Sequence, residues 1–274
     1  MNLTAFSASA FAVAVLILAQ SVTVLALRLF GERLWPAQAH RPATDRSNLH
    51  AWVLGLLSQF ALNPAMGAAV TVLVNRAGGG LIALPSHGWG LLLGLAAYLV
   101  AMDLGEYLFH RAQHSLPWLW AWHSLHHSDP TFDATTTVRH FWLDPFLKSV
   151  TVWLAVGLLF KAPEPIPLIY GAVTLYNFVI HSNTRLDLGR WSWLLNAPGY
   201  HRLHHSASPE HFDINFAALL PIFDLLSGSY RPAKPGERPA TGLDTGDKPE
   251  TAMDVLLWPV RRRQPRTLAE PDAA

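Results

Sequence analysis

The feature that most constrains this chain is a series of long segments without charged residues. Residues 3–27 carry no charge and are long enough to cross a bilayer as one helix. Residues 51–74 form a second segment, with a predicted kink at Asn63–Pro64, and residues 89–109 form a third. A signal peptide would need a positive first region and a shorter apolar core, which residues 3–27 lack. The three segments therefore predict transmembrane helices.

Two shorter apolar segments follow, at 146–160 and 166–182, separated by "KAPEP" at 161–165. Their length predicts a tilted helical hairpin, or one that crosses only part of the bilayer. A composition of 51% hydrophobic and 14% charged residues is also unlike that of a soluble domain. The predicted fold is all-α: an integral membrane helical bundle of about four to five membrane helices or half-helices, with a cytoplasmic histidine-rich helical cap.

The positions of the arginines predict an orientation in the membrane. Residues 28–50 contain Arg28, Arg33, Arg41 and Arg46, whereas residues 75–88 contain only Arg76. By the positive-inside rule, the first of these loops is cytoplasmic and the N-terminus lies outside. Following the helices onward brings every histidine-rich motif to the cytoplasmic face. The chain is therefore expected to be a multi-pass protein, of a bacterial inner membrane, with a metal site on the cytoplasmic side.

Composition shifts divide the chain into three predicted parts. Residues 1–88 hold the N-terminal membrane helices, and residues 89–230 hold most of the histidines and, from the motifs described below, are the predicted catalytic domain. Residues 231–274 are rich in Pro, Gly and charge. The last part is expected to be a flexible cytoplasmic tail. Within it, residues 252–263 could form a surface helix with Trp258 at the lipid headgroups, and an ordinary cytoplasmic arginine run is the equally weighted alternative.

Three histidine motifs stand out: "HRAQH" at 110–114, "HSLHH" at 123–127 and "HRLHH" at 201–205. With 14 His in 274 residues, the pattern H-x-x-H-H is expected in about one five-residue window in eight thousand. Two copies in one chain are therefore not explained by composition. Each copy places three imidazoles on one helical turn, where they are expected to converge.

The first motif continues a polar face of the third membrane segment. At 100° per residue, the side chains of Asp103, Glu106, His110 and His114 fall within an arc of about 80°. Ionisable groups on one face of a membrane helix are expected to point into the bundle. The isolated His40, His50 and His87 have no such context, and they are expected to be ordinary hydrogen-bonded residues.

The eight histidines of the three motifs exceed what one tetrahedral zinc site needs, and they predict two metal ions with imidazole-rich shells. Imidazole suits Zn, Fe, Cu and Ni alike. The chain has no cysteine, so cysteine zinc sites and thiolate iron–sulfur clusters are excluded. The H-E-x-x-H motif of zinc hydrolases is also missing. Two irons that activate O2 account for the ligand set better than a hydrolytic zinc.

The chain contains, in this order, the motifs "YLFHRAQH", "WAWHSLHHS", "IHSN", "NAPGYHRLHHS", "DINF" and "FDLLSGSY". This series of motifs resembles that of the fatty acid hydroxylase/sterol desaturase superfamily. The resemblance covers residues 98–230, and it is nearest to the alkylglycerol monooxygenase-like and bacterial sterol desaturase-like branches. It implies a non-haem di-iron oxygenase of the membrane that oxidises a lipid C–H bond with O2 and two external electrons. The ligands that it implies are His110, His114, His123, His126, His127, His181, His201, His204 and His205.

Two further parts of the resemblance concern individual residues. Many relatives read T-x-x-R-x-H-P-x-E after the second motif, whereas this chain reads "TTVRHFWLD" at 136–144, with Phe141 in place of the histidine. His140 is shifted by one position, so its role as a tenth metal ligand is left open. Asn215 and Asp224 match family positions close to the metals, where Asn215 is expected to act through a water or a hydrogen bond and Asp224 to orient an imidazole N–H. Ordinary capping is the alternative for both residues.

The predicted function is that of a lipid hydroxylase whose substrate is a fatty acyl, sterol or ether lipid. A desaturase acting through the same site is the first alternative, because the outcome depends on the placement of the substrate. A membrane zinc hydrolase and a metal-buffering or transport protein are weaker alternatives. Electrons are expected from a separate protein, a ferredoxin or a cytochrome b5-like carrier. The net charge of +1 argues against a nucleic-acid partner.

Overall fold

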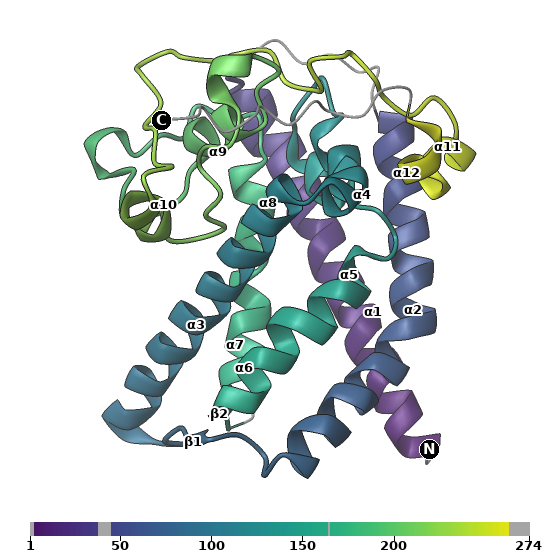
Figure 1. Cartoon of the computed structure of the whole chain (residues 1–274), viewed down its shortest axis with the longest axis vertical. Coiled ribbons are helices and arrows are strands. Elements are labelled where there is room, and N and C mark those ends of the chain that lie inside the picture. Colours follow the sequence, from purple (N-terminus) through teal and green to yellow (C-terminus); the bar gives the residue numbers. More distant parts are fainter. Residues whose placement is uncertain (1–2, 38–44, 164, 263–274) are drawn as a thin grey trace.

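The computed structural model describes residues 3–37, 45–163 and 165–262. Its long helices run side by side from one end of the molecule to the other (Figure 1). The bundle consists of these segments: α1 (Leu3–Ala26), the π-helical η1 (Leu27–Glu32), α2 (Asp45–Arg76), α3 (Gly88–Ser115), α5 (Asp144–Lys148), the π-helical η4 (Ser149–Trp153), α6 (Leu154–Leu159), α7 (Pro165–Val173) and α8 (Tyr176–Ile180). Two-residue strands β1 (Ile82–Ala83) and β2 (Phe160–Lys161) pair in parallel at one end of this bundle.

Within the described residues, α3 is long and apolar enough to cross a membrane. The two halves of α2, Arg46–Leu62 and Ala65–Arg76, pass the same test together and are bent by 48°, so the predicted kink near Asn63–Pro64 is confirmed. The apolar Pro165–Ile180 segment is shorter than a full span. The fold is all-helical with one or two candidate spans, and the larger number of four to five stays a prediction.

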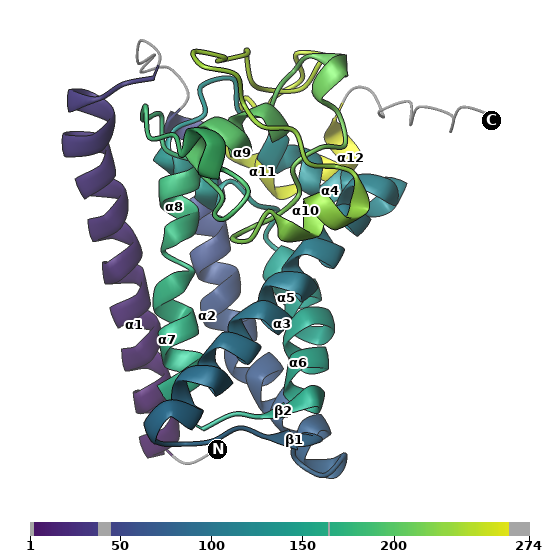
Figure 2. The same cartoon turned by 90° about the vertical axis from the view of Figure 1, so that its left-hand side faces the viewer.

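The opposite end of the bundle carries a cap of short helices and loops (Figure 2). The cap consists of α4 (Pro117–His127), α9 (Pro198–His204), α10 (Ile222–Ser227), α11 (Ala252–Leu256), α12 (Trp258–Arg261) and the 3-10 turns η3 (Ala134–Val138), η5 (Gly189–Trp191) and η6 (Pro209–His211). Pro117 and Pro198 each stand at the first position of a histidine-bearing helix, where a proline loses no hydrogen bond and pre-sets the backbone angle.

A close approach between α3 and η4 brings the hairpin against the helix that carries the first histidine motif. A Cβ on Gly105 would lie 2.8 Å from Val152 Cγ1, so only glycine allows this contact. Met102, Phe109 and Val152 pack in the same apolar cluster with residues of α6 and α7. This packing sets the position of α5 and η4 beside the polar face of α3.

The segment after residue 231 differs from the flexible tail that its composition predicts. Trp258 is 2% exposed, packs with Ala51 and Leu125, and donates its indole N–H to Ser124 Oγ at 2.9 Å. It therefore does not lie at the headgroup surface. Burial of one large aromatic side chain and these hydrogen-bonded contacts outweigh a local composition that favours disorder. The last predicted tail residues, 263–274, lie outside the described residues.

Candidate metal centre

Five histidines from three helices form one group with their nitrogens close together. His110 and His114 lie in the C-terminal part of α3, His123 and His127 lie in the C-terminal part of α4, and His204 is the last residue of α9. One ring nitrogen from each of the five lies within 4.8 Å of the others. His110 Nε2 lies 3.0 Å from His123 Nε2, and His127 Nε2 lies 3.2 Å from His123 Nε2. This set is called the first group.

Four further histidines form a second group on the neighbouring side of α4 and α9. Its members are His126, His181, His201 and His205, all buried, and their ligand nitrogens again lie within 4.8 Å of one another. His181 Nε2 lies 3.1 Å from His126 Nε2 and 2.9 Å from His201 Nε2. His181 follows directly after α8, so the hairpin supplies one donor to the cap.

Each H-x-x-H-H motif is divided between the two groups. His123 and His127 belong to the first group, whereas His126 belongs to the second. On a helix, positions i and i+4 point about 40° apart, whereas position i+3 lies about 100° from i+4. The expected convergence of all three imidazoles of a motif on one point is therefore wrong. One motif instead serves two adjacent sites.

Backbone carbonyls orient several of the rings. Nδ1 lies 2.7 Å from Phe216 O in His110, 2.8 Å from Ile214 O in His204, and 2.7 Å from Asn177 O in His181. Because a carbonyl only accepts, the Nδ1–H of each ring donates and Nε2 keeps a free lone pair. In His110 and His181 that nitrogen lies 3.0 and 2.9 Å from Nε2 of another member of the same group.

The spacing and chemistry of these nitrogens fit bound metal ions. Donors at right angles around one ion, each about 2.1 Å from it, lie about 3.0 Å apart, and the shortest contacts within the groups are 2.9–3.2 Å. Nε2 of His204 and of His205 is buried without a hydrogen-bond partner among the described residues. Such orphaned lone pairs are unfavourable unless a metal or a proton occupies them.

Protonation is also disfavoured in the cap. First burial and then the neighbouring imidazoles hold the pKa well below its usual range in His123, His126, His127, His201, His204 and His205. These rings are therefore neutral at pH 7, the form in which imidazole binds a metal. The described residues contain two buried histidine clusters able to bind metal.

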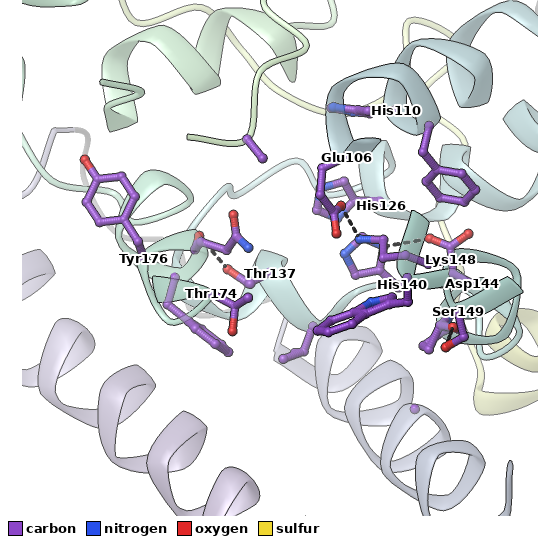
Figure 3. Close-up of a pocket in the computed structure, with 18 of the residues that line it drawn as sticks. Glu106, His110, His126, Thr137, His140, Asp144, Lys148, Ser149, Thr174 and Tyr176 are labelled. Atoms are coloured by element: carbon purple, nitrogen blue, oxygen red, sulfur yellow. Dashed lines mark hydrogen bonds and ion pairs between the residues drawn. The ribbon is translucent and has the colours of Figure 1, made fainter. Parts of the chain in front are cut away.

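His140 lies beside the two groups and belongs to neither, but together with His123 and Asp144 it forms a third group that could hold an ion. Its ring stacks on that of His126 with centroids 4.3 Å apart and 12° between the planes. Its Nδ1 lies 3.3 Å from Asp144 Oδ2, and Figure 3 shows this contact at the wall of the adjoining cavity. Asp144 in turn accepts hydrogen bonds from Gln113 Nε2 at 3.0 and 3.2 Å.

Asn215 and Asp224 form hydrogen bonds with backbone groups and hydroxyls beside the histidines, and none of these bonds is to an imidazole. Asp224 accepts hydrogen bonds from the backbone N–H groups of Phe216 and Ala217 and from the Tyr200 and Ser229 hydroxyls, at 2.6–2.9 Å. Among the described residues, Asp224 therefore makes no hydrogen bond to an imidazole N–H, although one was expected. It instead holds the loop that contains Phe216, and the carbonyl of Phe216 accepts a hydrogen bond from His110. Asn215 has a φ of 57°, a conformation that asparagine tolerates better than most residues.

Substitution of Asp224 by alanine is expected to lower activity more than tenfold while part of the metal is retained. Four donors would lose a buried acceptor, and the loop that orients His110 would shift. Asn215→Ala is expected to act in the same direction, because Asn215 Nδ2 donates to the carbonyls of Tyr200 and Arg231. Turnover and metal content measured together test this prediction, and full activity in both variants would indicate ordinary capping.

Several supporting residues were not identified from the sequence. The Glu32 carboxylate accepts from the backbone N–H groups of Ala134 and Asn183, at 2.8 and 2.9 Å, and so joins η1 to the cap. Asn48 in α2 accepts from Arg139 Nη1 at 2.9 Å and donates to Asp129 Oδ2 at 2.9 Å. Their only sequence signal is a polar residue next to an apolar segment.

A cavity of about 660 Å³ adjoins the histidines and extends into the bundle. Its wall includes His110, His123, His126, His181 and His201, together with residues of α2, α3, η4, α7 and α8. Leu99 also lines it and precedes His110 by eleven residues, so the lining extends about 16 Å along α3. A cavity of this size and shape accommodates an elongated apolar molecule next to both groups.

These features define a protein of apolar helices with buried histidine clusters that are able to bind metal. The sequence matches the family described as fatty acid hydroxylase over residues 95–229, the part that contains all nine grouped histidines. This chain belongs to the fatty acid hydroxylase superfamily.

Three curated relatives illustrate the similarity. An alkylglycerol monooxygenase of Xenopus tropicalis is 29% identical over 216 residues, which are 77% of this chain and 46% of that protein. The ornithine lipid hydroxylase OlsE of Rhizobium tropici is 28% identical over 78% of this chain and 66% of its own length. A delta(7)-sterol 5(6)-desaturase of Gibberella zeae is 26% identical over 54% and 45%.

The chain spans less than half the length of the alkylglycerol monooxygenases that it matches. No solved structure matches the sequence.

Proposed function

We propose that this protein is a membrane-bound di-iron oxygenase that hydroxylates a C–H bond of a lipid. Two irons would be held by the first group and the second group, with O2 as co-substrate and electrons from a separate ferredoxin or cytochrome b5-like protein. The relatives named as lipid hydroxylases and monooxygenases support this assignment at low identity.

The observation that carries the proposal is the joint position of the two histidine groups and the cavity. Members of both groups line the same 660 Å³ space. The site thus combines an imidazole shell large enough for two metal ions with room for an apolar chain. A hydrolase would need neither nine imidazoles nor this arrangement.

The bound irons would supply the reduction of O2 and the oxidising power for the C–H bond. Overall, one C–H bond, one O2, two electrons and two protons yield one hydroxyl group and one water. The residues of the chain bind the lipid, exclude bulk water from the cavity, and fix the orientation of the imidazoles through the carbonyls of Phe216, Ile214 and Asn177.

Desaturation is the second candidate reaction, and it is supported by the similarity of the chain to a sterol desaturase. It would remove a second hydrogen atom from the neighbouring carbon instead of adding a hydroxyl group. The choice between the two outcomes depends on how closely the second carbon approaches the site. Mass spectrometry of the product separates them, because hydroxylation adds one oxygen atom and desaturation removes two hydrogens.

The test is iron analysis of the detergent-purified protein, followed by oxygen uptake with a reductant and a lipid extract under 18O2. We expect about two irons per chain, lipid-dependent oxygen uptake, and 18O in the lipid product. His87→Ala is a matched control, because His87 is exposed and lies outside both groups. Oxygen uptake that does not depend on lipid, or a protein active with zinc alone, would contradict the proposal.

The proposed orientation predicts the location of reporter fusions. Fusions after Arg46 and at Ala274 should report the cytoplasm, and fusions near Gly79 should report the outside, because the positive charges lie in the first loop. In the bundle, the β1 region that follows Gly79 lies at the end opposite the histidine cap (Figure 1), whereas Ala274 lies outside the described residues. A cytoplasmic signal at Gly79 would contradict the predicted helix count.

A further inference from the structure

The cavity contains an ion pair that the metal centre does not use. Lys148 Nζ, at the end of α5, lies 2.7 Å from Glu106 Oε2 of α3, and both residues line the cavity (Figure 3). Glu106 precedes His110 by four residues, which is one helical turn. The pair therefore lies about 6 Å along the helix from a member of the first group.

Charged residues within an apolar bundle are uncommon and usually serve a function. An ion pair that only joined α3 to α5 would be expected to be shielded from the cavity. Here the Glu106 side chain is 16% exposed and that of Lys148 is 33% exposed. Both side chains thus border the cavity, and each head keeps hydrogen-bonding capacity beyond the single contact between them.

The surroundings of the pair determine which chemical group it accepts. Glu106 and Lys148 neutralise each other, and the nearby Asp144 adds a further carboxylate held by Gln113 and beside His140. This end of the cavity therefore carries no excess positive charge for a carboxylate or a phosphate. A hydroxyl group can both accept from the ammonium and donate to the carboxylate without adding charge.

We propose that Glu106 and Lys148 bind the uncharged hydroxyl-bearing end of the lipid, which directs oxidation to a carbon within a few bonds of that end. The apolar chain then extends away from the histidines, toward Leu99, Val70 and Trp153 in the cavity wall. This inference rests on the proposed function, because it places the polar end of the substrate one turn from the metal ligands.

Binding measured without turnover tests the subsite directly. Under anaerobic conditions, 1-hexadecanol, palmitate and hexadecylammonium compete for the purified protein, and they share one chain length. The unmodified protein should prefer hexadecanol. Glu106→Gln leaves the Lys148 charge unmatched, so it should shift the ratio of palmitate to hexadecanol affinity about tenfold toward palmitate. Lys148→Met should shift the ratio about tenfold toward hexadecylammonium.

The reciprocal change in head-group selectivity separates a binding role from a structural one. Loss of a helix-to-helix contact would weaken all three ligands alike. Arg261→Met is the matched control, because Arg261 forms an ion pair with Asp254 at 3.1 Å on the surface and should leave every ratio unchanged. Unchanged ratios in both cavity variants would overturn the inference, and where one variant does not fold, the other decides the result.

The position of the new hydroxyl group provides a second measurement. For whichever lipid the oxygen-uptake assay identifies, tandem mass spectrometry should place the oxidised carbon within a few bonds of the polar end. Oxidation near the far end of the chain would overturn the inference while leaving the proposed function intact. A protein that binds hexadecanol with the predicted selectivity, but never oxidises a lipid, would instead contradict the proposed function alone.

Discussion

Replacing any one of six cap histidines with alanine is expected to abolish lipid oxidation and to leave about one iron per chain instead of two. The variants are His123→Ala, His127→Ala and His204→Ala in the first group, and His126→Ala, His201→Ala and His205→Ala in the second. Removal of one imidazole leaves its ion with too few donors, whereas the other group keeps its own set. Iron analysis and turnover of each purified variant are the measurements.

Double substitutions test the grouping itself. His123→Ala combined with His127→Ala removes two donors from the first group, so about one iron should remain. His204→Ala combined with His205→Ala removes two adjacent histidines that belong to different groups, so both irons should be lost. The His87→Ala control should retain both irons. Equal iron content in the two doubles would contradict two separate groups, and near-normal turnover in two or more single variants would contradict a shared site.

The sequence was sufficient to single out six of the histidines that the structure brings together, because H-x-x-H-H twice in one chain is rare by composition. His110 and His114 came from a separate motif, and His181 came from the resemblance to a known family. It was not sufficient to assign each histidine to a group. That assignment depends on the rotation of α4 and α9 about their axes, which is set by packing contacts such as Leu125 against Trp258. These contacts join residues more than 100 positions apart, and local periodicity does not encode them.

The hydrogen-bond acceptors that orient the imidazoles could not be predicted from the sequence, for a different reason. The acceptors for His110, His204 and His181 are main-chain carbonyls, which every residue carries, so no residue type marks them. Asp224 did carry a signal as an acid after an apolar segment, but its role in holding the 214–218 loop emerges only from the folded backbone. In the last segment, Trp258 is buried against the cap although the average composition of that segment favours disorder.

His181→Ala is expected to lose about one iron and all activity, whereas His140→Ala is expected to keep both irons and lose activity only in part. The two residues differ in what their nitrogens face. His181 Nε2 lies 3.1 Å from His126 Nε2 and 2.9 Å from His201 Nε2, within the second group. Its Nδ1 is fixed by Asn177 O at 2.7 Å, so the ring is held as a neutral donor.

His140 has a different set of neighbours. Its Nδ1 faces Asp144, its ring stacks on that of His126, and its side chain is 36% exposed. Loss of this ring would free one face of His126 without removing a donor from either group, so a partial effect on turnover is expected. Iron per protein and turnover, measured on both variants in the same detergent, decide between these roles. An intact pair of irons in His181→Ala would show that α8 contributes no ligand, and loss of one iron in His140→Ala would make His140 a tenth donor.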